Sequence, residues 1–293
     1  MKMADIAWTE TNNEFGEHNI SHHDTCMEST NRSKKLNNND SQFHKMEFEY
    51  DELDSTIVLR GKSNISHSTG LTIWTCSQVL SGFLLDNPHY VKDQNVLELG
   101  AGVGLASIVA HHLGADRVLS TDGDICVLEN LRHNIQNNRL SSSFDCDEEE
   151  EEKKFEHDDD TEKSNTKSSS NSNSSTGLIC CPQLVWGKKL NEFQDTYGRQ
   201  SILLGTDIFY NHECVDPIWQ TVDHLLEDGG SFLLAFAPHK VEMKTVLEKA
   251  QQFGFSWIKP SITDDGNEEE NDMSYFNNCS FGYHVFVFQR DEQ

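Results

Sequence analysis

Three glycines at alternate positions follow a short apolar run in the stretch V-L-E-L-G-A-G-V-G-L, which extends from Val96 to Leu105. They are Gly100, Gly102 and Gly104, and a helix-like apolar segment follows them. Glycine allows a tight turn and lets a ligand approach the backbone N–H groups closely. A strand that turns through glycines into a helix is typical of nucleotide-binding α/β proteins. This stretch therefore predicts a site for a nucleotide-like ligand.

An acidic residue occurs where such a site needs one. The segment A-D-R-V-L-S-T-D, residues 115–122, predicts a short strand that ends in Asp122. In a βαβ nucleotide fold, a carboxylate at the end of the second strand accepts hydrogen bonds from the ribose hydroxyls. We predict this role for Asp122, with a helix cap as the alternative. Asp124 is expected to assist it or to cap the next helix.

The glycine spacing distinguishes between classes of nucleotide. The dinucleotide fingerprint is G-x-G-x-x-G, but here Leu105 occupies the position of its third glycine. This spacing disfavours an NAD-dependent oxidoreductase. The pattern E-x-G-x-G-x-G, from Glu98 to Gly104, instead resembles the first motif of the class I S-adenosylmethionine-dependent methyltransferases. That resemblance implies S-adenosyl-L-methionine as the cofactor.

Strand and helix patterns alternate around these motifs, which indicates an α/β fold with a parallel sheet and right-handed crossovers. The order resembles the seven-stranded, Rossmann-like sheet of class I methyltransferases, with helices on both faces and an antiparallel last strand. Gly229 and Gly230 are expected to stop the helix before the fifth strand. The predicted strands are 96–99, 118–121, 178–186, 201–207, 231–237, 255–258 and 282–288, and the predicted helices are 73–84, 105–112, 125–137, 215–226 and 241–253.

Composition divides the chain into one domain and two polar segments. Residues 1–45 are rich in Asn, Ser, His and acidic residues, and we expect a disordered tail. Residues 46–290 are the expected methyltransferase domain, which begins with one or two strands within 46–59. The acidic and Ser/Asn-rich stretch 141–176 cannot build a core and predicts a disordered insertion. We favour a passive solvated loop, and an arm that recruits a basic partner is the alternative.

The chain of 293 residues carries a formal net charge of −26. Nucleic-acid backbones are bound by basic surfaces, so this charge disfavours a nucleic-acid partner and favours a basic protein. The eight cysteines show no metal-ligand spacing, and several lie in apolar runs, as in reduced cytosolic proteins. No apolar stretch resembles a signal peptide or reaches the length of a membrane span. We therefore expect a cytoplasmic monomer, with the nucleus as a second location and with no metal or membrane partner.

Four motifs together resemble the lysine methyltransferase-like proteins of family 16, which modify non-histone proteins. The first is T-G-L-T-I-W, which ends at Trp74, and the second is the glycine motif with S-T-D-G-D. The third is L-V-W-G, residues 184–187, and the fourth is D-I-F-Y, residues 207–210. The resemblance covers about residues 65–290 apart from the insertion. T-D-G-D and the A-P-H-K after the fifth strand also resemble the calmodulin-lysine methyltransferases.

The resemblance implies a role for each motif residue. Glycines and acidic residues would hold the amino-acid and ribose parts of the cofactor, and two tryptophans would pack on or near it. The family often has an acidic residue where this chain has Val185, and this departure weakens the expectation for contacts on the adenine side. The implied cofactor-binding residues are Trp74, Glu98, Gly100, Gly102, Asp122 and Trp186, and the implied catalytic residues are Asp207 and Tyr210.

The implied reaction transfers a methyl group to an amine, which must be neutral when it attacks. The pKa of a lysine is about 10.4 in water, and desolvation in an apolar channel lowers it. We expect Asp207 to align the amine and Tyr210 to line the channel; a strand-end cap and a packed tyrosine are the alternative. The resulting prediction is a protein N-methyltransferase that acts on lysine. A protein histidine or arginine, or a small molecule, is an alternative acceptor, and a non-catalytic cofactor-binding scaffold is an alternative of another class.

Overall fold

The computed structural model describes residues 43–62, 69–140, 177–237, 241–260 and 282–290. The predicted insertion at 141–176 and the P-H-K of the A-P-H-K motif lie outside these residues. The predicted tail also lies outside them, apart from its last three residues. Those residues belong to a strand, β1 (Phe43–Phe48), which therefore begins before the predicted domain boundary at residue 46.

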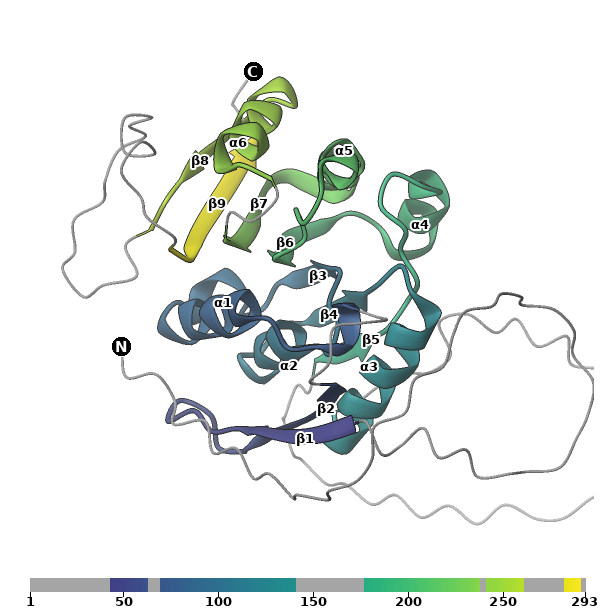
Figure 1. The fold of residues 1–293 in the computed structure, drawn as a ribbon, viewed down its shortest axis with the longest axis vertical. Helices are drawn as coiled ribbons and strands as arrows, with labels where there is room; N and C mark the ends of the chain where they lie inside the picture. The colour runs from purple at the N-terminus through teal and green to yellow at the C-terminus, as the bar shows by residue number, and fades with distance from the viewer. Residues whose placement is uncertain (1–42, 63–68, 141–176, 238–240, 261–281, 291–293) are drawn as a thin grey trace, which may run out of the picture.

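A seven-stranded sheet forms the centre of the fold (Figure 1). Its strands are mostly apolar and largely buried on both faces, as expected where helices cover a sheet from both sides. In chain order they are β3 (Asn95–Leu99), β4 (Arg117–Thr121), β5 (Leu178–Cys180), β6 (Gln200–Thr206), β7 (Leu226–Phe236), β8 (Phe255–Ile258) and β9 (His284–Arg290).

The strand order across the sheet is β5-β4-β3-β6-β7-β9-β8. The first five strands in this order pair in parallel, and β9 is antiparallel to both of its neighbours. The parallel sheet was predicted from the sequence, and the antiparallel last strand agrees with the resemblance to class I methyltransferases. Parallel strands end at the same edge of a sheet, so the segments that follow β3, β4 and β6 lie close together there.

Helices cover both faces of the sheet (Figure 1). Most of them lie within a few residues of the predicted ranges, because their apolar residues recur at helical spacing. They are α1 (Thr75–Asp86), α2 (Leu105–His112), α3 (Ile125–Asn137), α4 (Leu190–Tyr197), α5 (Val215–Leu225) and α6 (Met243–Gln252), with short 3-10 turns η2 (Thr69–Leu71), η3 (Pro88–Tyr90) and η4 (His212–Cys214).

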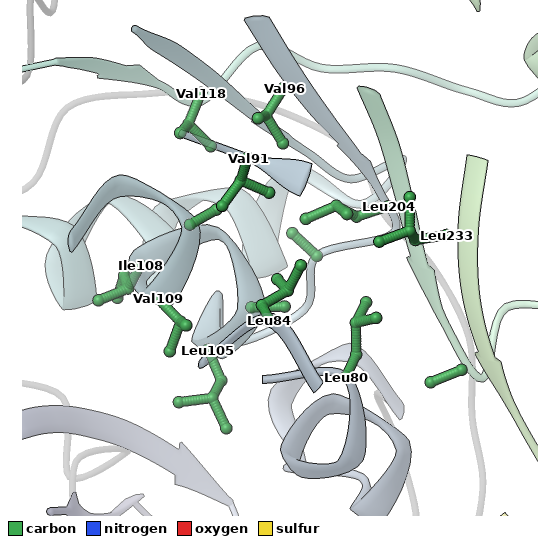
Figure 2. Close-up of a cluster of buried hydrophobic side chains, with 14 of the residues drawn as sticks. Leu80, Leu84, Val91, Val96, Leu105, Ile108, Val109, Val118, Leu204 and Leu233 are labelled. Carbon is green, nitrogen blue, oxygen red and sulfur yellow. The ribbon is translucent and has the colours of Figure 1, made fainter. Parts of the chain in front are cut away.

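Each face of the sheet has its own buried apolar cluster. Helices α1, α2 and α3 cover one face, and α4, α5 and α6 cover the other (Figure 1). On the first face, Leu80 and Leu84 of α1 and Ile108 of α2 pack toward Val96 and Leu233 of the strands (Figure 2). Each fully buried side chain of this kind contributes about 1.5–3 kcal/mol. The two clusters therefore fix the strands whose ends carry the site.

A separate hairpin of β1 and β2 (Ile57–Lys62) packs against α3 through three asparagines. The side-chain amide of Asn134 accepts from the N–H of Arg60 at 2.8 Å and donates to its carbonyl at 3.1 Å. Asn138 makes the same pair of bonds with Val58, each at 2.8 Å, and Asn130 donates to the Arg60 carbonyl at 2.9 Å. Asn134 and Asn138 are four residues apart along the helix, which corresponds to a rise of about 6 Å. Arg60 and Val58 are two residues apart along the strand, which corresponds to about 6.7 Å. The two asparagines therefore align with the two backbone positions that they bind.

The third strand is shorter than predicted. It ends at Cys180 instead of Trp186, because Pro182 has no N–H to donate to a sheet ladder. A single bridge between Asp122 and Gln183 continues the pairing. The segment that carries Trp186 therefore lies alongside the end of β4 as a loop.

Two further differences concern the second half of the chain. Helix α4 was not predicted; it spans only eight residues and fully buries only Phe193, so few apolar residues mark it. The expectation that Gly229 and Gly230 stop α5 is wrong, because α5 ends at Leu225 and β7 begins at the next residue. The two glycines instead lie within β7, where its register with β6 shifts. Among the described helices, none is both long enough and apolar enough to cross a membrane.

Candidate active site

The glycine loop between β3 and α2 is tied to the end of β4. Gly100, Gly102 and Gly104 have φ angles of 66°, 57° and 92°, a backbone conformation that glycine adopts without steric cost. The N–H of Ala101 donates to the carbonyl of Thr121 over 2.8 Å. The loop is therefore fixed at the edge where the parallel strands end, which is where nucleotide sites form in such sheets.

Asp122 lies beside this loop. One of its carboxylate oxygens accepts from the N–H of Gly102 at 3.2 Å, and the other accepts from the N–H of Asp124 at 3.0 Å. Burial raises the pKa of Asp122, and these N–H groups oppose that shift. Asp124 caps α3, since its carboxylate accepts from the N–H of Cys126 at 2.8 Å. The helix-cap function thus belongs to Asp124, and Asp122 orders the loop.

Glu98 is fully buried beneath the start of α2. One carboxylate oxygen accepts hydrogen bonds from the N–H of Ser107, at 2.9 Å, and from the Ser107 hydroxyl. The other oxygen has no hydrogen-bond partner among the described residues. Burial raises the pKa of Glu98 to about 7, and the bonds from Ser107 oppose this shift. A buried oxygen without a partner is costly, and a ligand that donates to it would remove that cost.

The ring of Trp186 lies against Gly100. A Cβ built on Gly100 would lie 2.9 Å from Cζ2 of Trp186, so this contact requires glycine. The buried indole N–H of Trp186 finds no acceptor within the described part of the chain. The Trp186 ring also contacts Tyr210, with ring centroids 6.1 Å apart. The turn after Trp186 is held by the N–H of Gly187, which donates to the Thr221 hydroxyl at 2.8 Å.

Trp74 lies directly before α1, which begins two residues later than the predicted helix. Its indole N–H donates to the carbonyl of Thr69 at 3.0 Å and anchors the half-buried ring to η2. In the same turn, the carbonyl oxygen of Gly70 lies 3.0 Å from a Cβ built on Gly102. Trp74 is therefore connected to the glycine loop through η2.

The D-I-F-Y motif forms a turn directly after β6. Asp207 has a φ of 56°, a left-handed conformation that costs a non-glycine residue about 1 kcal/mol. Its N–H donates to the carbonyl of Ala235 on β7 at 3.0 Å. Cγ2 of Ile208 lies 3.2 Å from a Cβ built on Gly100, so this turn contacts the glycine loop. Backbone strain of this kind is concentrated at functional sites.

Tyr210 forms the outer wall of the site. Its side chain is 50% exposed while its ring contacts Trp186. Burial of the other part of the side chain raises the pKa of the Tyr210 phenol, and Cys214 and the charge of Asp122 raise it further. The turn that carries Tyr210 is fixed by Asn211, whose side chain accepts from the N–H of Cys214 at 2.9 Å.

The structure thus brings the predicted residues to one edge of the sheet, and it adds two residues that the sequence reasoning missed. Asn211 precedes a helical turn, a position at which asparagine is a common cap, so a local signal for it was present. Cys76 of α1 is buried near Asp207, and the charge of Asp207 adds to the burial that raises the pKa of the Cys76 thiol. This proximity joins two distant segments and leaves no local pattern. Val185, the departure from the family pattern, is 40% exposed and lies beside Gly123.

Two of the four motifs that suggested family 16, T-G-L-T-I-W and the glycine motif, lie within a stretch that matches a family description. Residues 53–150 match the lysine methyltransferase family, and this match confirms the resemblance. The chain is 28% identical over 228 residues to the protein-lysine N-methyltransferase EFM3 of Chaetomium thermophilum, covering 74% of this chain and 58% of the relative. It is 30% identical over 163 residues to the protein N-lysine methyltransferase METTL21A of Xenopus tropicalis, covering 56% and 58%. The chain thus spans less than two thirds of the length of these relatives.

Solved structures support the fold. The 16S rRNA N2 G1207 methyltransferase of T. thermophilus, solved in complex with AdoMet and guanosine, matches with a TM-score of 0.50 at 14% identity. The match covers 88% of this chain and 53% of that protein. At this identity the likeness concerns the fold alone, and it agrees with the observed strand order of a class I methyltransferase. The finer resemblance to calmodulin-lysine methyltransferases stays a prediction.

Proposed function

We propose that this chain, whose residues 53–150 match the lysine methyltransferase family, is an S-adenosylmethionine-dependent protein N-methyltransferase that acts on lysine. One observation carries the proposal: the glycine loop, Asp122, Trp186 and the D-I-F-Y turn converge on one edge of a class I methyltransferase sheet. The relatives named above are protein-lysine methyltransferases, which supports lysine as the acceptor.

The described residues fit S-adenosyl-L-methionine in charge and in shape. The unpaired carboxylate oxygen of Glu98 suits the ammonium group of the methionine part, and the carboxylate of Asp122 suits the ribose hydroxyls. Trp186 offers an aromatic face and an unpaired indole N–H beside the glycine loop. When bound, the cofactor supplies an activated methyl group on a positively charged sulfur.

The residues on the acceptor side would align and desolvate the amine. The carboxylate of Asp207 can accept a hydrogen bond from it, and the rings of Trp186 and Tyr210 limit access of water. Removal of water lowers the pKa of the amine, whereas a nearby carboxylate raises it. We therefore assign alignment to Asp207 and desolvation to the aromatic residues.

The acceptor is proposed to be a side chain of a protein. Tyr210 is half exposed, so the acceptor side reaches the surface, where a side chain of a macromolecule can enter. The net charge of −26 favours a basic partner. We also propose that the chain works as a monomer in the cytoplasm, with the nucleus as a second location. Light scattering during gel filtration would contradict the monomer if it gave twice the chain mass.

Cofactor binding is tested by calorimetric titration of the full chain with S-adenosylmethionine, with NAD as the control ligand. We expect binding in the micromolar range for the first ligand only. Asp122→Ala should weaken this binding about tenfold or more, because it removes charged hydrogen bonds. Glu213→Ala, which removes an exposed acidic residue of η4, is the matched control and should bind normally. Absence of binding by the unaltered chain would contradict the proposal.

Methyl transfer is tested with a radiolabelled methyl donor and cell lysate as the source of acceptors. We expect a labelled protein band whose hydrolysate contains methyllysine; methylhistidine, methylarginine or a labelled small molecule would identify the alternative acceptors. Asp207→Ala should keep cofactor affinity and lose most of the labelling, since it removes only alignment. Full labelling by this variant would overturn the role of Asp207. Cofactor binding without any labelled product would favour a scaffold.

A further inference from the structure

We propose that Asn134 is a positioning residue for the glycine loop, and that it couples docking of the β1–β2 hairpin to binding of the cofactor. The inference rests on the proposed function, because it gives the hairpin a task only if the glycine loop holds S-adenosylmethionine. Asn134 lies in the second half of α3, outside every motif that suggested the family. The hairpin likewise lies outside the seven-stranded sheet that carries the site.

The side-chain amide of Asn134 joins two backbones. Its oxygen accepts from the N–H of Arg60 on β2 at 2.8 Å, and its nitrogen donates to the Arg60 carbonyl at 3.1 Å. The same nitrogen donates to the carbonyl of Val103, which lies between Gly102 and Gly104, at 2.9 Å. An amide has two N–H donors, so both are used, and the side chain is fully buried. The amide therefore fixes β2 and the glycine loop relative to each other.

Packing at the same place brings the loop into contact with both elements. A Cβ built on Gly61 of β2 would lie 3.4 Å from Cγ1 of Val103, so the strand reaches this side chain. From α3, Cδ1 of Leu131 contacts the Cβ position of Gly104. Val103 and Leu131 are both almost completely buried. The end of the glycine loop is thus enclosed by α3 and by the hairpin.

Strand β2 depends on α3 for its second row of backbone partners. It pairs with β1 on one side only, and the backbone groups on the other side of such a strand need partners of another kind. Asn138 supplies them at Val58, where it bonds the N–H and the carbonyl at 2.8 Å each. Of the two asparagines, only Asn134 also bonds the glycine loop in the part of the chain that the structure describes. The pair therefore separates docking of the hairpin from its link to the loop.

The link between hairpin and loop acts in both directions. The N–H of Gly102 donates to Asp122, the residue proposed to hold the ribose, and the carbonyl of the next residue, Val103, accepts from Asn134. Loss of the bond from Asn134 frees the loop to leave the conformation that binds the cofactor, which weakens binding. Coupling between two sites is reciprocal, so bound cofactor must strengthen docking of the hairpin by the same factor.

Calorimetric titration of full-length variants with S-adenosylmethionine measures the first direction. Asn134→Ala should raise Kd about fivefold, the size of one lost hydrogen bond. Asn138→Ala, which also loses two bonds to the hairpin, is the matched control and should leave Kd unchanged. Both variants are titrated at a temperature at which circular dichroism shows them folded. Equal Kd values for the two variants would overturn the role of Asn134.

Hydrogen exchange resolved by residue measures the reverse direction and needs no variant. Bound S-adenosylmethionine should slow exchange of the Val58 N–H about fivefold, because this group becomes free when the hairpin leaves α3. The N–H of Gly198, which is bonded at the end of α4, is the control and should exchange at an unchanged rate. In Asn134→Ala the slowing at Val58 should disappear. Absence of slowing in the unaltered chain, or slowing that persists in Asn134→Ala, would overturn the coupling.

Exchange without cofactor separates this inference from the proposed function. Asn134→Ala should speed exchange of the Gly102 N–H, which is bonded to Asp122, and Asn138→Ala should not. Equal exchange at Gly102 in the two variants would overturn the positioning role, whether or not the cofactor binds. If exchange at Gly102 depends on Asn134 but the unaltered chain binds no S-adenosylmethionine, the proposed function fails and the positioning of the loop stands.

Discussion

The buried carboxyl of Glu98 makes the free energy of unfolding of the protein depend on pH. Burial raises the pKa of Glu98 to about 7 in the folded protein, so between the ordinary carboxyl range and pH 7 the folded state binds more protons than the unfolded state. The free energy of unfolding should therefore fall as the pH rises through this window, by about 3 kcal/mol for a shift of this size. Above pH 7 this contribution no longer changes.

Urea unfolding of the unaltered chain and of Glu98→Gln, each at pH 5 and pH 7.5, isolates this contribution. Other groups titrate in the same window, among them His284, whose pKa burial lowers to about 4. They are present in both proteins and cancel in the difference. We expect the loss of stability with pH to be smaller in Glu98→Gln. Equal losses in the two proteins would show that Glu98 keeps its ordinary pKa.

Strain at Asp207 predicts an unusual order of stability among its variants. Alanine at this position retains the steric cost of a positive φ, whereas glycine does not. Asp207→Gly should therefore be more stable than Asp207→Ala by about 1 kcal/mol, although glycine normally costs stability in an ordered chain. Chemical unfolding of the two variants measures this difference. If Asp207→Ala were the more stable variant, the strained turn would not exist in solution.

At the scale of elements, the glycine loop combines a conformational and a steric requirement. Gly102 has a φ of 57°, and a Cβ on it would lie 3.0 Å from the carbonyl oxygen of Gly70. Gly254, which follows α6, has a similar φ of 75°, with nothing within 4 Å of its Cβ position. Both alanine variants should lose about 1 kcal/mol through backbone strain. Only Gly102→Ala should also weaken binding of S-adenosylmethionine in a calorimetric titration, and equal affinities would contradict the close packing of η2 on the loop.

The asparagine contacts between α3 and the hairpin predict a second separable effect. Asn134 is fully buried, bonds both backbone groups of Arg60 and also donates to the carbonyl of Val103 in the glycine loop at 2.9 Å. Asn134→Ala removes the bonds to the N–H of Arg60 and to the carbonyl of Val103, while Asn130 still donates to the Arg60 carbonyl, and it should cost about 2–3 kcal/mol in thermal or urea unfolding. Asn137→Ala, which removes only an exposed bond to His133, should change stability by less than about 0.5 kcal/mol. Similar costs for the two variants would contradict this docking.

The sequence predicted elements and motifs well where the determining pattern is local. Helix α3 matches its predicted range because apolar spacing and the cap at Asp124 act within one turn. The third strand was predicted too long because its apolar run continues past Pro182, although the ladder does not. The proximity of Cys76 to Asp207 could not be predicted, because it depends on how α1 packs against the end of β6. Contacts of that kind are products of tertiary packing.

At the scale of the whole molecule, the two residues that flank the insertion, Leu140 and Gly177, lie at the edge of the sheet opposite to the site. Helix α3 starts after β4 at the carboxyl edge and returns the chain to the amino edge, where β5 begins parallel to β4. The N–H of Leu178 donates to the carbonyl of Asp116, directly before β4. The described chain therefore stops at Leu140 and resumes at Gly177, both at the edge far from Asp122 and Asp207.

This arrangement predicts that the insertion can be removed without loss of the cofactor site. Replacement of residues 141–176 by about eight Gly/Ser residues should leave the affinity for S-adenosylmethionine unchanged. A shorter loop should stabilise the fold by about 1 kcal/mol, because it costs less entropy to close. Calorimetric titration and urea unfolding test both expectations. Weaker cofactor binding by the shortened chain would mean that the insertion acts on the site.

The connection between β4 and β5, which contains α3 and the insertion, divides the active site between two parts of the chain. Strands from the two parts are neighbours in the sheet. The part before this connection supplies β3, β4 and the glycine loop, and the part after it supplies Trp186, Asp207 and Tyr210. Strand β5 of the second part pairs with the outer side of β4, while β6 pairs with the inner side of β3. After a cut within the insertion, the first fragment would keep only the β4–β3 pair of the seven-stranded sheet, and the second would have a gap between β5 and β6. Cofactor capture would appear only when they reassemble, which makes this chain a natural template for a split-protein sensor.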